Sequence, residues 1–174
     1  FVDLKFFDVP ATVGRAVKQL NNKKVDFVTI HGNNAIMQAA AEQKGALKVL
    51  AVTVLTSLDR GDLDDLGFDC DVEKLVASRA KRAIKLGCDG VISSGLEAPE
   101  LRDSLGTNFL IVSPGIRPVD NRPEDDQKRV VSGEQAFYNG ADHIVAGRRI
   151  RDAEDPRKAA LAIQKSIYNI FNPS

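Results

Sequence analysis

The stretch LKVLAVTVL, residues 47–55, is an almost uninterrupted apolar run, and the polar residues Thr56 and Ser57 follow it directly. A strand that is apolar on both faces is typical of a parallel sheet covered by helices. Polar residues at the end of such a strand lie at the edge where α/β proteins place their active sites. The stretch therefore predicts a parallel α/β fold with a site at the carboxyl ends of its strands.

The same pattern recurs along the chain. We expect strands at residues 1–5, 25–31, 47–55, 90–93, 109–113 and 143–147, each followed by a helical segment. The clearest helices are residues 72–86 and 156–171, where apolar residues recur at helical spacing. Pro156 suits the first turn of the second helix, with Asp155 as its N-cap. No linker divides the pattern, so we expect residues 1–174 to form a single domain.

Two α/β architectures fit alternating strands and helices, the open doubly wound sheet and the closed eightfold barrel. A doubly wound nucleotide fold carries GxGxxG after its first strand, and this chain has none. In a barrel, active-site residues follow the strands. The polar residues at strand ends here are Asp3 and Lys5, Thr56 and Ser57, Ser113 with Pro114 and Gly115, and Gly147 with Arg148. We therefore predict a TIM (β/α)8 barrel, of which only six strands can be counted.

Composition indicates an ordinary enzyme domain. Hydrophobic residues make up 43% of the chain, and 24 Lys and Arg balance 24 Asp and Glu, which argues against nucleic acid or an anionic membrane as partner. No apolar run approaches the roughly 20 residues that span a bilayer, and no secretory signal pattern opens the chain, so we expect a cytoplasmic protein. Cys70 and Cys88 form no CxxC pair, and His31 and His143 lie far apart, so no metal site is predicted.

The segment Asp3-Leu4-Lys5-Phe6-Phe7-Asp8 places two carboxylates around one lysine at the end of an apolar strand. Strand alternation sends Asp3 and Lys5 to the same face. An ammonium held between carboxylates stays charged and can deliver a proton to a carbon that has just become negative. The alternative is a structural ion pair at a strand end.

Two glycine-containing strand ends predict a phosphate site. Gly115 lets backbone N–H groups approach an anion closely, and Gly147-Arg148 adds a guanidinium at a strand-to-helix turn. Between them, residues 117–129 are polar and rich in Pro and Asp, which is typical of a mobile loop and suits a lid. Considered alone, each element is better explained by turn glycines or by a solvated arginine pair, and only the two together favour a phosphate site.

The combination of these motifs resembles the bacterial orotidine 5'-phosphate decarboxylase family. DLKFFDVP at residues 3–10 is similar to the family's DxKxxD-[IV]-P signature, and AVTVLTS at 51–57 is similar to its strand-five ending. SPGIRP at 113–118, followed by DQKR at 126–129, resembles its phosphate loop, and Gly147-Arg148 resembles its last phosphate contact. DxKxxD alone is shared with sister families, whereas the combination is much more specific.

The resemblance implies roles residue by residue. Lys5 is implied as the catalytic proton donor, Asp3 as its partner beside the scissile carboxylate, and Asp8 as a carboxylate that reaches the neighbouring site of a homodimer. The implied substrate contacts are Thr12, Thr56, Arg117, Gln127, Gly147 and Arg148. The substrate would be orotidine 5'-monophosphate and the product UMP, with no metal or cofactor. Ala11 departs from the Asn that bacterial members commonly carry there.

The resemblance also implies two strands before Phe1, which would carry an Asp that contacts the ribose and a second Lys. We therefore expect the first two βα units to be absent and the barrel to be N-terminally incomplete. Two alternatives stay open. One is a sister enzyme, a 3-keto-gulonate-6-phosphate decarboxylase or hexulose-phosphate synthase, which typically uses a metal; residues 114–118 and Gln127 argue against it. The other is an inactive phosphate-binding fragment, which would bind UMP without turnover.

Overall fold

The computed structural model describes residues 1–116 and 128–172. The strands are β1 (Val2–Phe6), β2 (Phe27–His31), β3 (Lys48–Val52), β4 (Gly90–Ile92), β5 (Leu110–Ser113) and β6 (His143–Ile144). The helices are α1 (Pro10–Leu20), α2 (Asn34–Gln43), α3 (Arg60–Asp65), α4 (Val72–Lys85), α5 (Ala98–Leu105), α6 (Gly133–Tyr138), α7 (Arg148–Arg151) and α8 (Pro156–Phe171).

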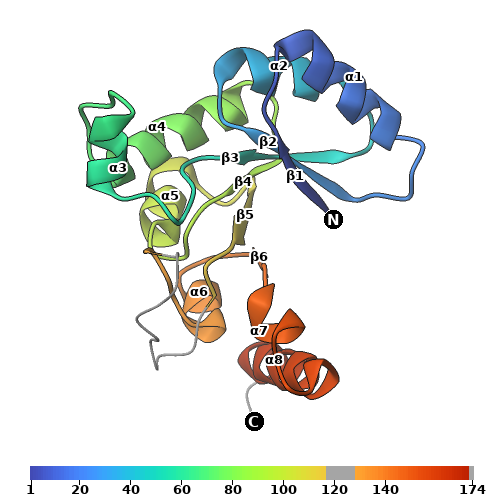
Figure 1. Cartoon of the computed structure of the whole chain (residues 1–174), viewed down its shortest axis with the longest axis vertical. Coiled ribbons are helices and arrows are strands. Elements are labelled where there is room, and N and C mark those ends of the chain that lie inside the picture. The colour runs from blue at the N-terminus through green and yellow to red at the C-terminus, as the bar shows by residue number, and fades with distance from the viewer. Residues whose placement is uncertain (117–127, 173–174) are drawn as a thin grey trace.

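The strands form one parallel sheet in chain order, from β1 to β6. An unreversed order is that of a barrel, because a doubly wound sheet reverses its strand order part-way. The sheet curls, and the helices lie around its outer side (Figure 1). All six predicted strands are therefore present, and the open doubly wound alternative is wrong.

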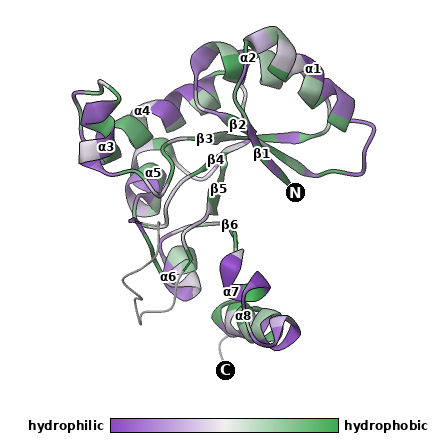
Figure 2. Cartoon of the chain, viewed as in Figure 1, coloured by the Kyte–Doolittle hydropathy of each residue, from purple (hydrophilic) through white to green (hydrophobic). Residues whose placement is uncertain are grey.

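Both faces of the sheet are apolar, which explains the near-continuous apolar strands. Val49, Ala51 and their neighbours pack outward against the helices, in one cluster with residues such as Met37 and Ala80. The opposite face carries a smaller cluster of buried residues: Leu50, Val52, Ile92 and Val112. In Figure 2, helices α1 and α4 each carry hydrophilic (purple) and hydrophobic (green) residues. This is expected for a helix with one face on the sheet and the other in water.

Two strands end three residues before their predicted last residues. The third ends at Val52, and the chain turns a few residues later, where Leu58 N–H donates to the Leu55 carbonyl (2.9 Å). The sixth ends at Ile144, and Gly147 instead precedes the short helix α7. The predicted start of α8 is confirmed, since the Asp155 carboxylate accepts a hydrogen bond from Lys158 N–H (2.9 Å).

The amino ends of the strands carry a repeated stabilising arrangement. Asp89 Oδ2 accepts hydrogen bonds from Val49 N–H and from the Lys44 ammonium, both at 2.8 Å. Asp142 Oδ2 likewise accepts from Ile111 N–H and from the Arg102 guanidinium, both at 2.7 Å. These ion pairs fix neighbouring strands at the edge opposite the predicted site.

No helix among residues 1–116 and 128–172 is long and apolar enough to cross a membrane.

Candidate active site

A pocket of about 200 Å³ opens at the carboxyl ends of the strands. Its lining comes from the ends of five strands and the turns after them: Lys5, Val52, Val54, Leu55, Thr56, Ser57, Ile92, Pro114, Gly115, Val145, Gly147 and Arg148. The structure thus brings Lys5, Thr56, Gly147 and Arg148 to one pocket. A larger cavity of about 350 Å³ lies against α6 and α8, but its lining contains none of the predicted site residues.

Lys5 reaches this pocket through an irregular backbone. Its φ is 48°, the one positive value among the non-glycine residues that the structure describes, and the pairing of β1 with β2 shifts register between Val2 and Phe6. A bulge of this kind re-aims a side chain at the end of a strand, and a left-handed non-glycine residue costs about 1–3 kcal/mol. Surrounding contacts must therefore hold Lys5 in place.

Those contacts come from Asp3 and Thr29. Lys5 Nζ donates to Asp3 Oδ2 at 2.8 Å, as predicted for two residues on one face. Thr29 is fully buried in β2; its hydroxyl accepts from Lys5 N–H (2.9 Å) and donates to Asp3 Oδ1 (2.8 Å). Thr29 therefore connects the strained backbone of Lys5 to the carboxylate that pairs with its ammonium.

A histidine, His31, lies near Lys5. His31 is the last residue of β2, and its ring lies 4.5 Å from that of Phe7. Burial lowers the pKa of His31 from its usual value, and the charges of Arg79 and Lys5 lower it further. The imidazole is consequently held in its neutral form near the lysine. Its position at the end of a predicted strand is the signal that could have placed it there.

Backbone contacts fix Thr56, which is buried at the rim of the pocket. The Thr56 carbonyl accepts hydrogen bonds from Lys128 N–H (3.1 Å) and Arg129 N–H (3.2 Å). The Lys128 ammonium also donates to Asp59 (2.7 Å) and Asp62 (2.8 Å) at the start of α3. The Lys128 hydrogen bond is the main cause that lowers the pKa of Asp59 to about 2.

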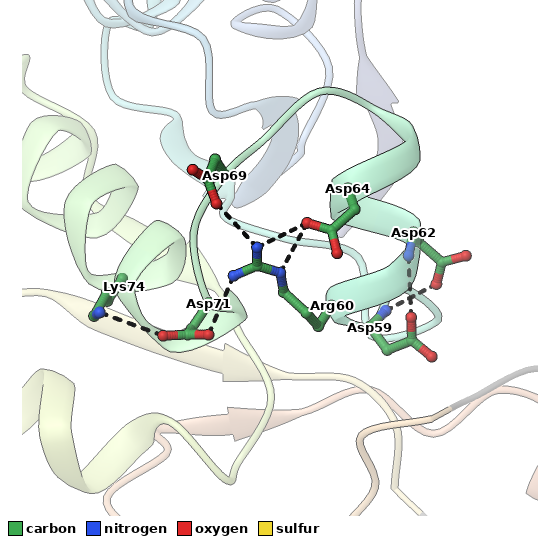
Figure 3. A network of polar contacts seen from close by, with 7 residues as sticks. All are labelled: Asp59, Arg60, Asp62, Asp64, Asp69, Asp71 and Lys74. Carbon is green, nitrogen blue, oxygen red and sulfur yellow. Dashed lines mark hydrogen bonds and ion pairs between the residues drawn. The ribbon is translucent and has the colours of Figure 1, made fainter.

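Arg60, the first residue of α3, is surrounded by carboxylates from α3 and from the segment after it (Figure 3). Its guanidinium contacts Asp64 at 2.8 Å, Asp69 at 3.1 Å and Asp71 at 3.3 Å. The hydrogen bond to Asp64 is the largest of the effects that raise the pKa of Arg60. Since these groups are exposed, we interpret the network as surface ion pairs that fix α3. The start of α3 also contacts Lys128, which holds the Thr56 carbonyl.

The predicted phosphate end combines Gly115, Gly147 and Arg148. Gly115 has a φ of 73°, a conformation that glycine adopts without a steric penalty. Gly147 precedes α7, of which Arg148 is the first residue, and the Arg148 side chain is exposed at the pocket. A guanidinium beside two glycine turns can hold an anion. Arg117 and Gln127 lie outside the described residues.

Asp8 and Thr12 lie outside this pocket. Asp8 is exposed and accepts a hydrogen bond from Val9 N–H (2.6 Å), whereas the Thr12 hydroxyl in α1 accepts from Arg15 (3.2 Å). Phe7 and Val9, which flank Asp8, are 66% and 62% exposed, and Leu4 is 66% exposed.

The chain is similar to known proteins along nearly its whole length. Residues 1–163 match the family described as "Orotidine 5'-phosphate decarboxylase / HUMPS family". The chain is 68% identical over 171 residues to the orotidine 5'-phosphate decarboxylase of Methylococcus capsulatus, covering 98% of this chain and 71% of that protein. The chain belongs to this family. The decarboxylase of Stenotrophomonas maltophilia is 51% identical over 169 residues, which are 96% of this chain and 70% of that protein.

Solved members of the orotidine 5'-phosphate decarboxylase family share the fold. The crystal structure from Lactobacillus acidophilus superposes with a TM-score of 0.79 at 34% identity, covering 94% of this chain and 73% of that one. The barrel class predicted from the strand ends is therefore confirmed. Among the described residues, no group of three or more His, Cys, Asp or Glu is arranged to hold a metal ion.

Sequence reasoning missed residues that reach the site through others. Thr29 lies in the middle of an apolar strand, and nothing in its spacing distinguishes it from a core residue. The buried pair of Glu97 and Arg129 was also missed, although Arg129 belongs to the DQKR segment that carried the resemblance to the decarboxylase family. Their partners are far apart in the chain, so only the folded structure identifies them.

Proposed function

We propose that this chain catalyses the decarboxylation of orotidine 5'-monophosphate to UMP. The observation that carries the proposal is the ammonium of Lys5 at the pocket, paired at 2.8 Å with Asp3. The names of the relatives in Methylococcus capsulatus and Stenotrophomonas maltophilia support the same reaction. Those names also favour it over the sister sugar-phosphate enzymes.

The chemistry follows from charge. When the bond between C6 and the carboxylate breaks, its electron pair stays on C6 and CO2 leaves. The resulting carbanion has little delocalisation, so positive charge must lie where the negative charge develops. The Lys5 ammonium supplies that charge and then donates its proton to C6, and water returns a proton to the amine.

Asp3 has two functions in this proposal. Its carboxylate keeps Lys5 charged and oriented, because an adjacent anion favours the ammonium form. It also lies where the substrate carboxylate would approach, and repulsion there is relieved when CO2 departs. Ground-state repulsion of this kind contributes less than stabilisation of the carbanion by the ammonium.

The other end of the pocket would hold the remote parts of the substrate. Arg148 and Gly147 would contact the phosphate, together with Arg117, and Thr56 would contact the pyrimidine together with Gln127. Binding energy from the phosphate then helps to hold the ring in the reactive position.

We further propose a homodimer with shared sites, in which Asp8 and Thr12 reach the pocket of the second copy. The exposed apolar side chains of Leu4, Phe7 and Val9 support this arrangement, because a second copy would cover them. A cytoplasmic location belongs to the same proposal. Cys70 and Cys88 are both free thiols, as is common in a reducing compartment.

The proposal includes turnover without a metal or cofactor, since Lys5 provides the charge the carbanion needs. The test is decarboxylation of orotidine 5'-monophosphate by the wild-type chain and by Lys5→Ala, each with and without a chelator. We expect turnover by the wild type in both conditions and a loss of kcat of more than about tenfold in the variant, a barrier change above about 1.4 kcal/mol. UMP should still bind to Lys5→Ala, because the product has no carbanion.

Three results decide between the readings. Loss of wild-type turnover on chelation would favour a sister enzyme that uses a metal. UMP binding by the wild type without any turnover would identify a phosphate-binding chain that is not a catalyst. A Lys5→Ala variant that keeps most of its kcat would remove Lys5 as proton donor.

A further inference from the structure

Three consecutive carbonyl groups just after β3 accept hydrogen bonds from one dipeptide, Lys128-Arg129. The Arg129 guanidinium donates from Nη2 to the carbonyls of Val54 (3.0 Å) and Leu55 (2.9 Å). The next carbonyl, that of Thr56, accepts from the backbone N–H groups of Lys128 and Arg129. All three residues that supply these carbonyls line the pocket beside Lys5.

A buried carboxylate fixes the guanidinium itself. Arg129 Nη1 donates to Glu97 Oε1, and the two side chains are only 10% and 4% exposed. Glu97 Oε2 accepts from the Ser93 hydroxyl (3.0 Å), and the Ser94 hydroxyl donates to the Arg129 carbonyl (3.2 Å). The pair therefore connects the end of β4 to the end of β3 through residues 128 and 129.

This pair is costly to bury. Burial raises the pKa of Glu97, and the charge of Arg129 and the Ser93 hydrogen bond offset that effect only in part. Buried ion pairs of this kind add little net stability compared with apolar residues of similar size. Their value lies in geometry, because a planar guanidinium that contacts a carboxylate and two carbonyls allows one arrangement of the groups around it.

We propose that Arg129, held by Glu97, is a positioning residue that fixes the turn at residues 54–56 and so places Thr56 against the pyrimidine end of the pocket. The consequence for ligand binding rests on the proposed function, whereas the anchoring of the turn does not. Arg129 acts through the backbone of its neighbours and does not itself line the pocket.

The chain offers a matched control in Arg102. Its guanidinium also contacts one carboxylate, that of Asp142 (2.7 Å), and two carbonyls, those of Phe109 (2.9 Å) and Gly140 (3.0 Å). Its side chain is 15% exposed, close to the value for Arg129. Arg102, however, serves the amino ends of the strands, at the edge opposite the pocket.

The first measurement is amide hydrogen exchange in the ligand-free chain, comparing Arg129→Lys and Glu97→Gln with Arg102→Lys. We expect exchange at residues 54–58 to be at least about tenfold faster in the first two variants and unchanged in the control. The single nitrogen of lysine cannot span the acceptors that Arg129 reaches from Nη1 and Nη2, and Glu97→Gln removes the charge that holds the guanidinium. Equal exchange in all three would overturn the proposal. Glu97→Gln keeps the side-chain volume, so it decides the matter if Arg129→Lys does not fold.

The second measurement compares the affinities for UMP and for ribose 5-phosphate, and so distinguishes contacts to the pyrimidine from contacts to the phosphate end. We expect Arg129→Lys and Glu97→Gln to weaken UMP by about tenfold and ribose 5-phosphate by less than about twofold, with Arg102→Lys near wild type for both. Equal weakening of the two ligands, or none, would overturn the placement of Thr56. A wild-type chain that binds neither ligand would instead refute the proposed function, and the exchange result would still decide the anchoring.

Discussion

Replacing Thr29 by valine removes a side chain that holds both Asp3 and the strained backbone of Lys5. Valine has nearly the same shape, so the change deletes two hydrogen bonds without opening a cavity. The bond to the Asp3 carboxylate involves a charged partner and contributes about 1.5–3 kcal/mol, and the bond from Lys5 N–H contributes about 0.5–1.5 kcal/mol. Asp3 is 32% exposed, so water compensates part of its loss and the lower values apply.

We therefore expect Thr29→Val to lower the free energy of unfolding by about 2–3 kcal/mol, measured by urea titration. Thr53→Val is the control, because Thr53 is equally buried and lies just beyond β3, the strand next to β2. Its hydroxyl donates to the Ile92 carbonyl (2.9 Å), which also accepts from Thr53 N–H (3.2 Å) and so stays paired. The control should cost only about 0.5–1 kcal/mol.

The two variants should differ more in catalysis than in stability. Without Thr29, the left-handed conformation of Lys5 loses its support and the ammonium loses its fixed position, so kcat should fall by at least about tenfold. Thr53→Val should stay within about twofold of wild type. Equal losses of stability in the two variants, or a fully active Thr29→Val, would refute the idea that Thr29 supports Lys5.

Three further outcomes follow from other parts of the structure. Arg148→Ala should weaken the binding of UMP by at least about tenfold and leave the binding of uridine nearly unchanged, as measured by calorimetry. Equal losses of affinity for the two ligands would mean that Arg148 supports the fold and does not contact the phosphate. Mixing Asp8→Ala with Lys5→Ala chains should restore some activity in one site of the heterodimer, and no recovery after verified subunit exchange would contradict shared sites. The pKa of Asp59 is lowered from 3.8 to about 2, mainly by Lys128. The contribution of Asp59 to stability is therefore complete above pH 3.8 and is lost as the pH falls toward 2. In Lys128→Ala, the urea midpoint should drop less than in the wild type across that pH interval.

The sequence by itself determined the class of fold and most of the pocket. Strands that are apolar on both faces specify a parallel sheet buried on both sides, as the two clusters on either side of residues 48–52 show. Polar residues directly after those strands then converge, since parallel strands end at one edge. Lys5, Thr56 and Arg148 could be placed together on that reasoning alone.

Only the tertiary structure decided how these side chains are held. Local alternation places Asp3 and Lys5 on one face, but it does not reveal the positive φ of Lys5 or the threonine from the next strand that supports it. Likewise, Glu97 lies 32 residues before Arg129, and no periodicity connects them. Contacts between distant segments depend on which strands become neighbours, and that is a property of the folded chain rather than of any one stretch of it.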